Sequence, residues 1–296
     1  MSKPNIVCFM MDQLSAKWLE AASAGACPTP NIDALRARGV SFTNCITSNP
    51  VCCPTRATLA TGLTTRQHGV LENGYQLDLE LPTFMRVLQQ AGWRTGALGK
   101  VHFQPHYRSQ HPDYRPYGFD VTHITEDGRG GEWFDWVEKE HPEHYDDVLA
   151  LIWAAAIPEF SAYGPNKVNL KERIRAVQKD YKWSTPEFPL NTRGAHTLLF
   201  PEEVSQTNWI TGHGLDFIRS TPADQPICAH ISYVQPHGPF HPPGEKADPQ
   251  EVAKTQTHDM AEIRQQLAAE EAAQGRGGRP PAQPTTASKQ KKSWFS

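Results

Sequence analysis

The residues best suited to chemistry lie in one short stretch, residues 52–56, of sequence CCPTR. Pro54 suits the first turn of a helix, so we expect a helix over about Pro54–Ala60 with Cys52 at its start. Unpaired backbone N–H groups at such an end favour an anion and lower the pKa of a thiol placed there. Arg56 adds a fixed charge suited to an oxyanion. The stretch indicates a nucleophile in an anion-binding site, and two ordinary buried thiols are the alternative.

The two adjacent cysteines differ in their spacing to the proline. Cys52 has a two-residue offset to Pro54, and Cys53 lacks it. We therefore assign the nucleophilic role to Cys52 and a structural role to Cys53.

A carboxylate follows the first predicted strand. Residues 5–11 form a continuous apolar run, as expected for a strand buried on both faces, and Asp12 and Gln13 follow it. Parallel α/β sheets bind ligands at the carboxyl ends of their strands, which makes Asp12 a candidate ligand. A solvated loop residue or a helix cap is the alternative.

Two further predicted strands also end in polar residues. The strand expected over 93–98 precedes Lys100 and His102, which alternate and can therefore face one side. The strand expected over 227–234 leads to His237 in a proline-rich loop, which restricts the backbone there. A surface lysine and ordinary hydrogen-bonded histidines are the alternative.

The intervening segments supply the elements that position these residues. We expect helices over 29–39, 82–90 and 202–219 and a strand over 40–46, while 63–73 reads as a loop with Asn73 as a polar candidate.

Composition divides the chain into two regions. Residues 1–245 form the predicted catalytic domain, in which 104–200 is an elaborated, aromatic-rich insertion. Residues 246–296 are low in complexity, and we expect them to be helical and then disordered.

Bulk properties narrow the class of protein. The 296 residues carry a formal net charge of −3, which suggests neither nucleic acid nor an anionic membrane as partner. No apolar run has the length of a membrane span, and none reads as a signal peptide. The six cysteines show no zinc-type or disulfide-framework spacing, so we expect a reduced, cytoplasmic protein.

In this order, the motifs resemble the N-terminal half of the sulfatase family, within the alkaline-phosphatase-like superfamily, over roughly residues 4 to 245. The segments that carry the resemblance are Pro4-Asn5-Ile6-Val7 through Asp12, Thr29-Pro30-Asn31-Ile32-Asp33, Cys52-x-Pro54-x-Arg56 through Thr61-Gly62, Gly99-Lys100-x-His102 and Pro236-His237-x-Pro239-Phe240. The resemblance implies an α/β fold, an alkaline-phosphatase-like sandwich whose mostly parallel central sheet is flanked by helices. The pair Asp12-Gln13 resembles the branch of choline-sulfatase-like enzymes and phosphonate monoester hydrolases, and Lys100 with His102 favours a sulfatase within it.

The resemblance also implies a reaction, the hydrolysis of a small sulfate ester. In the family, a formylglycine-generating or anaerobic sulfatase-maturing enzyme oxidises the cysteine, here Cys52, to formylglycine (3-oxoalanine). The aldehyde hydrates on a divalent cation, for which Ca²⁺ is our first choice and Mg²⁺ or Mn²⁺ the alternatives. One hydroxyl then attacks sulfur, the alcohol leaves, and the second hydroxyl drives collapse of the sulfated intermediate.

The matching positions imply the following roles. The metal ligands would be Asp12, Gln13 and Cys52. Arg56 would orient the nucleophile, and His102 would lie beside it. The sulfate would be held by Lys100 and His237, with Gln13 and Asn73 as further substrate contacts.

The second half of the family pattern has no match after residue 245. Relatives carry further metal ligands and a second active-site lysine there, and His258-Asp259 has the wrong order for them. We therefore expect about half of a sulfatase site, in a fold truncated on its C-terminal side, with poor cation affinity. A phosphonate or phosphodiester hydrolase and a truncated, non-catalytic fragment are the alternatives, and a homo-oligomer is compatible with the sequence.

Overall fold

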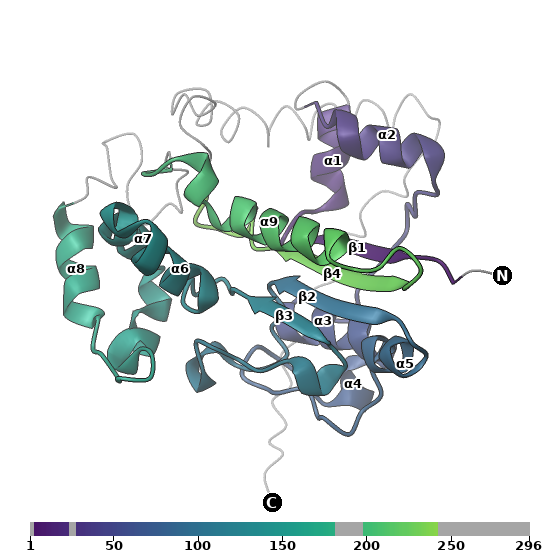
Figure 1. Cartoon of the computed structure of the whole chain (residues 1–296), viewed down its shortest axis with the longest axis horizontal. Helices are drawn as coiled ribbons and strands as arrows, with labels where there is room; N and C mark the ends of the chain where they lie inside the picture. The colour runs from purple at the N-terminus through teal and green to yellow at the C-terminus, as the bar shows by residue number, and fades with distance from the viewer. Residues whose placement is uncertain (1–2, 24–27, 181–197, 242–296) are drawn as a thin grey trace, which may run out of the picture. The chain divides into compact units, whose positions relative to one another are not determined.

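The computed structural model describes residues 3–23, 28–180 and 198–241, and all structural statements below refer to these residues. They contain a four-stranded, all-parallel sheet with the order β1-β4-β2-β3 (Figure 1). The strands are β1 Ile6–Met11, β2 Arg94–Gly99, β3 Val121–Ile124 and β4 Ile227–Tyr233.

Long crossover segments connect the strands, as parallel pairing requires, and two of the three contain α-helices. The α-helices are α1 Ala16–Ser23, α2 Pro30–Arg38, α3 Cys52–Thr61, α4 Thr65–His68, α5 Phe84–Gln90, α6 Glu132–Glu140, α7 Tyr145–Ala150, α8 Lys171–Asp180 and α9 Gln206–Arg219. Shorter 3₁₀ segments are η1 His106–Arg108, η2 Arg115–Tyr117, η3 Pro142–His144, η4 Ala154–Ala162 and η6 Glu202–Val204.

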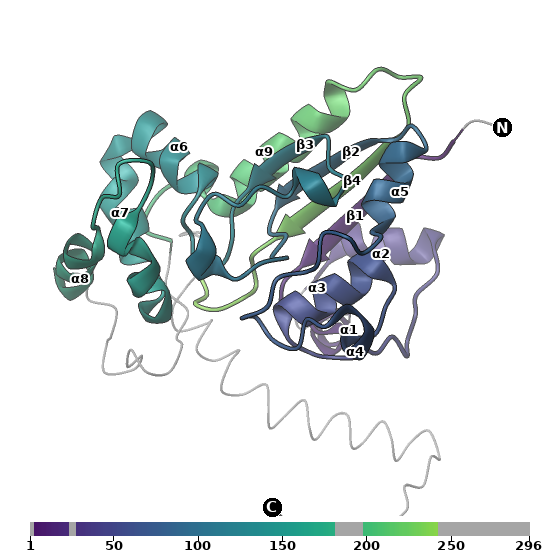
Figure 2. The same ribbon diagram turned by 90° about the horizontal axis from the view of Figure 1, so that it is seen from below.

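The sheet separates two hydrophobic layers. Helix α9 covers one face, while α3, α4 and α5 lie on the other (Figures 1 and 2). Successive residues of β2 point to opposite faces, so Leu98 packs with Ile210 of α9, and Ala97 packs with Ala57 of α3. This sandwich brings the start of α3 to the carboxyl ends of the strands.

One glycine lets β2 approach β4 where the strands end. Gly99 has a φ of +99°, and a Cβ atom there would lie 2.0 Å from the carbonyl oxygen of Ser232. Only glycine fits so close to a backbone. Lys100, the residue after Gly99, therefore lies at the edge of the sheet where the strands end.

The α/β class with a parallel sheet flanked by helices is confirmed, as are the strands expected over 5–11, 93–98 and 227–234. The strand expected over 40–46 is wrong: the segment forms no strand, and Val40, Phe42 and Ile46 are all exposed. Alternation alone cannot make a strand without a pairing partner. Burial of β1 on both faces is also wrong, because Val7 and Phe9 of this edge strand are exposed.

Residues 132–180 form a helical region that shares a hydrophobic core with α9. Trp133, Leu149, Phe160 and Ile174 are fully buried and belong to the same hydrophobic cluster as α9. The division into a 1–245 domain with a 104–200 insertion stays a prediction, and the tail at 246–296 lies outside the described residues. No helix in the described part of the chain has the length and apolarity needed to cross a bilayer.

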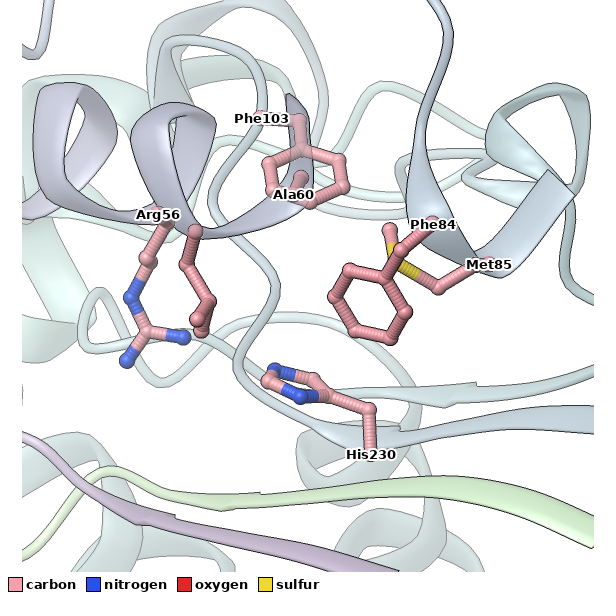
Figure 3. Close-up of a pocket in the computed structure, with 7 residues that line it drawn as sticks. Arg56, Ala60, Phe84, Met85, Phe103 and His230 are labelled. Atoms are coloured by element: carbon pink, nitrogen blue, oxygen red, sulfur yellow. The ribbon is translucent and has the colours of Figure 1, made fainter. Parts of the chain in front are cut away.

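A small pocket lies between α3 and α5 above the sheet. Figure 3 shows Arg56 and His230 at this pocket, with Phe84 and Phe103 among its other lining residues. Burial, and secondarily the charge of Arg56, lowers the pKa of His230 from 6.5 to about 3. The imidazole is therefore held neutral in the folded chain.

His230 should make the protein less stable in mild acid. Its folded pKa lies below its unfolded value, so only the unfolded chain gains a proton as pH falls from 6.5 toward 3. Between pH 6.5 and 5 this protonation lowers the free energy of unfolding by about 1.6 kcal/mol. In urea unfolding measured at both pH values, the acid-side loss of His230→Leu should be smaller than that of the parent chain by about this amount. An equal loss in both chains would contradict the buried neutral state.

Candidate functional site

Five side chains meet where β1, β2 and β4 end beside the start of α3. Asp12 follows β1, Lys100 follows β2, and His237 lies in the loop after β4, while Cys52 and Arg56 come from the first turns of α3. The parallel strands place their ends on one edge, and Asp12 N–H extends the ladder by donating to the carbonyl of β4. The structure thus brings together the residues that the sequence singled out at three separate strand ends.

Helix α3 begins at Cys52, two residues earlier than the sequence predicted, and its N-cap residue Val51 is extended. Pro54 still lies in the first turn, where a missing N–H costs nothing. The Cys52 Sγ lies 3.9 Å from Asp12 Oδ1, and the ligand atoms of Asp12, Cys52 and His237 all lie within 4.8 Å of one another. These three residues are a candidate metal group.

Lys100 is completely buried and paired with two carboxylates. Its Nζ contacts Asp12 Oδ2 and lies 3.0 Å from Asp127 Oδ2. Burial alone disfavours the ammonium, but the charges of Asp127 and Asp12 outweigh it and raise the pKa of Lys100. The lysine is therefore a permanent positive charge in the site.

Arg56 is fixed by the ends of two strands. One guanidinium nitrogen donates to the carbonyl of Lys100 at 2.6 Å and to Ser232 Oγ at 3.0 Å. Another lies 3.6 Å from Asp12 Oδ2. The planar guanidinium thus braces α3 against β2 and β4 while its charge faces the carboxylate.

The expected low pKa of the Cys52 thiol is wrong. Burial raises its pKa, and Asp12 and Asp127 oppose the lowering effect of Lys100 and Arg56. A helix N-terminus contributes only partial charge, which desolvation exceeds here. Cys52 is consequently a thiol in this environment rather than a ready thiolate nucleophile.

Cys53 is fully buried, as its structural assignment requires. Its backbone N–H, one of the free donors of the first turn, donates to Asn73 Oδ1 at 2.9 Å. Asn73 was predicted to contact substrate, yet its side-chain oxygen holds the start of α3 from a distant loop. This capping role is what the structure shows, and a substrate contact stays a prediction.

Gln13 and His102 follow the ends of β1 and β2 with left-handed backbones. Their φ values are 63° and 51°, uncommon for residues other than glycine. Gln13 is exposed, and no contact ties its side chain to Asp12 or Cys52 among the described interactions. His102 is buried and stacks on His106 at 3.9 Å, rather than contacting the thiol.

The sequence analysis missed Asp127. It follows β3, and its Oδ2 lies 3.0 Å from Lys100 Nζ and 3.5 Å from His237 Nε2. A carboxylate after a strand is the same signal that identified Asp12. It was overlooked here because β3 has only four residues and lies within the predicted insertion, so no strand was expected. Burial opposes its ionisation, yet Lys100 and His106 hold the pKa of Asp127 well below its usual value.

The chemistry available at this edge is that of an anion held by the fixed cations Arg56 and Lys100. Both pair with the Asp12 carboxylate, which lies beside the Cys52 thiol and His237. Preorganised positive groups of this kind stabilise charge on a transferring oxyanion. A carboxylate between them and the thiol is suited to holding a metal ion.

Comparison with known proteins agrees with this chemistry. A family model described as sulfatase matches residues 4–274, which confirms the resemblance inferred from the motifs. An arylsulfatase of Clostridium perfringens (strain 13 / Type A) is 25% identical over 255 residues, covering 81% of this chain and 45% of that protein. A choline-sulfatase of Rhizobium meliloti (strain 1021) is 33% identical over 167 residues, covering 51% and 33%.

The fold is also that of a solved hydrolase. The phosphonate monoester hydrolase of Agrobacterium radiobacter superposes with a TM-score of 0.55 at 23% identity, covering 81% of this chain and 42% of that one. The chain thus spans less than half the length of these proteins.

Removing the Asn73 cap should loosen the start of α3. Asn73→Ala leaves the Cys53 N–H without its acceptor, at a cost of about 1 kcal/mol. Asn73→Asp keeps an acceptor and adds charge that the helix N-terminus favours. Urea unfolding should therefore show a loss for alanine and none for aspartate. Equal losses in both variants would contradict the capping role.

Removing Lys100 should destabilise the chain because it leaves two buried carboxylates without a counter-ion. Lys100→Met leaves Asp12 and Asp127 without their shared cation, and breaking a buried pair costs roughly 3–5 kcal/mol. Adding Asp127→Asn removes one stranded charge, so the double variant should recover part of that loss. Urea unfolding of both variants measures the difference. A double variant no more stable than Lys100→Met would contradict the pairing.

Proposed function

Because the chain belongs to the sulfatase family, we propose that it is a sulfuric ester hydrolase that cleaves a sulfate monoester with a formylglycine derived from Cys52. The observation that carries the proposal is the position of Cys52 at the start of α3. Its sulfur lies 3.9 Å from the Asp12 carboxylate, beside Arg56 and Lys100.

The sulfatase family generally uses a metal ion together with formylglycine. Of the described residues, Asp12 offers a buried carboxylate next to Cys52, and the Gln13 amide could add a second oxygen. A hard cation such as Ca²⁺ takes six to eight oxygen ligands. The described residues therefore fit part of a divalent cation site, and Asp12 and Gln13 would hold the ion with position 52.

The formylglycine supplies a hydrated aldehyde as nucleophile, and the cation supplies charge that polarises the sulfate. The chain's own residues prepare that step. Arg56 fixes the start of α3, and so the position of residue 52, against the ends of β2 and β4. The charge of Lys100 then stabilises the oxygens of the transferring group.

Asp12 and Lys100 are coupled through one oxygen atom. The ammonium contacts Asp12 Oδ2, so a cation bound by that carboxylate would compete with the lysine for it. The displaced ammonium could then donate to a sulfate oxygen, and His237 is the second residue that we expect at the sulfate. In this way the cation and the sulfate group would favour each other's binding.

Two alternatives have specific support. Asp12-Gln13 resembles a branch that includes phosphonate monoester hydrolases beside choline-sulfatase-like enzymes, so a phosphonate monoester or phosphodiester hydrolase of the same superfamily is the first alternative. The partial oxygen donor set favours a sulfatase-derived fragment without activity. Turnover of a substrate panel by the matured chain separates all three.

The proposal includes a maturation partner and a compartment. Conversion of Cys52 needs a formylglycine-generating or anaerobic sulfatase-maturing enzyme. Five of the cysteines lie in the described residues, and all five are free thiols. We propose a cytoplasmic location, in which such thiols stay reduced.

The adjacent cysteines allow a matched test of the nucleophile. The chain is co-expressed with a maturing enzyme, and peptide mass spectrometry checks formylglycine at position 52. With a divalent cation, the matured chain should hydrolyse an aryl sulfate or choline sulfate faster than a phosphonate monoester. Cys52→Ala should lose turnover by several orders of magnitude, whereas Cys53→Ala should retain it.

Three results would contradict the sulfatase proposal. A preference for the phosphonate monoester would support the first alternative. No turnover despite confirmed formylglycine would support the inactive fragment. Turnover that survives Cys52→Ala would place the nucleophile elsewhere.

A further inference from the structure

A second group of ligand-type side chains lies next to the candidate active site. It consists of His102 after β2, His106 at the start of η1, and Glu126 and Asp127 after β3. Each residue offers one ligand atom, and these atoms all lie within 4.8 Å of one another. The two imidazole rings are stacked, with centroids 3.9 Å apart, so one ring would have to rotate to direct both nitrogens at a single ion.

Glu126 is oriented by its first carboxylate oxygen. Oε1 accepts hydrogen bonds from the backbone N–H groups of Val101 and His102, at 3.3 and 2.8 Å, and from the Tyr114 hydroxyl at 3.1 Å. These donors fix the carboxylate and leave Oε2 facing the group. Metal-ligating carboxylates are typically held in this way by outer hydrogen bonds.

Asp127 divides its two oxygens in the same manner. Oδ2 is directed at Lys100 and His237 of the candidate active site. Oδ1 lies 2.9 Å from His106 Nε2. One carboxylate therefore serves both groups of side chains.

The remaining polar atoms of the group are shielded from solvent. Among the described residues, His102 Nδ1, His106 Nε2, Glu126 Oε2 and Asp127 Oδ1 make no hydrogen bond of good geometry. His106 Nε2 is nevertheless 2.9 Å from Asp127 Oδ1 and 3.6 Å from Glu126 Oε2. These separations bracket the roughly 3.4 Å edge of a tetrahedron with metal–ligand bonds of about 2.1 Å.

We propose that His102, His106, Glu126 and Asp127 form a second metal site, which binds a divalent transition metal of the Zn²⁺ class. Two imidazole nitrogens and two carboxylate oxygens suit this class, whereas a hard cation such as Ca²⁺ prefers oxygen alone. The two carboxylates balance the ion's charge. The metal lies beside the proposed catalytic cation and shares the Asp127 side chain with the groups that face the sulfate.

A proton on His106 is the competitor for this metal. Burial disfavours that proton, but Asp127 and Glu126 outweigh it and raise the pKa of His106 to about 10. The proton on His106 can pair with one carboxylate oxygen at a time, whereas a metal ion would bond to the ligand atoms of all four residues. The competition makes metal binding a measurable alternative to a simple imidazolium–carboxylate pair.

Co²⁺ is the probe that distinguishes the two metal groups, because thiolate ligation adds a charge-transfer band to its spectrum. The full chain carrying Cys52→Ala is titrated with Co²⁺ and followed by visible absorption. We expect one equivalent to bind with a four-coordinate spectrum and without that band. Adding His106→Ala or Glu126→Gln should lower the affinity by more than about a hundredfold, which exceeds the effect of an outer-ligand change.

The control adds His111→Ala instead, which removes a histidine that pairs with Asp135 outside the group. It should leave Co²⁺ affinity unchanged. Tyr114→Phe, which removes only an outer hydrogen bond, should weaken binding roughly tenfold. Thermal unfolding checks that each variant is folded. If His106→Ala is not folded, the result for Glu126→Gln is the test.

No Co²⁺ binding by the Cys52→Ala chain would overturn the second site. Equal affinity in the Glu126→Gln variant would overturn it as well, and would leave His106 as a protonated partner of the two carboxylates. The readout is metal binding rather than turnover, so it stands apart from the test of sulfatase activity.

Discussion

The buried ammonium of Lys100 is the contact on which the rest of this structure depends. It joins Asp12 after β1 to Asp127 after β3, two strands that do not neighbour each other in the sheet. Burying any one of these charges alone would be costly, so each requires the others. The close approach of β2 to β4 at Gly99 puts the lysine where both carboxylates can reach it. Fold and site are thus specified by the same ion group.

The sequence predicts the fold well where the elements are long and regular. A continuous apolar run identifies β1, longer strand segments are also recognised at β2 and β4, and the polar residues after these strands locate the site. The short strand β3 was not predicted, because four residues are too few to show a clear periodicity. The expected strand at 40–46 failed for the opposite reason, since a pattern of alternation says nothing about whether a neighbouring strand exists to pair with it.

The site was predictable in its members and less so in its contacts. Residue type and position after a strand suffice to select Asp12, Lys100 and His237, and the start of a helix selects Cys52. They do not show that Asn73 would hold the start of α3, because that contact depends on how a distant loop folds back. The direction of the Cys52 pKa shift also depended on burial, which a helix start does not reveal by itself.

Charge balance connects the two groups of side chains. Three carboxylates, Asp12, Glu126 and Asp127, face three cationic side chains, Arg56, Lys100 and the protonated His106, all of them largely buried.

In such a nearly neutral and poorly solvated region, adding an anion alone or a cation alone leaves an uncompensated buried charge. In the proposed sulfatase reaction, a sulfate ester and a divalent cation that arrive together would largely avoid that penalty. Under that proposal the substrate and the metal would bind as partners, and Asp12 and Lys100 would change from pairing with each other to pairing with them.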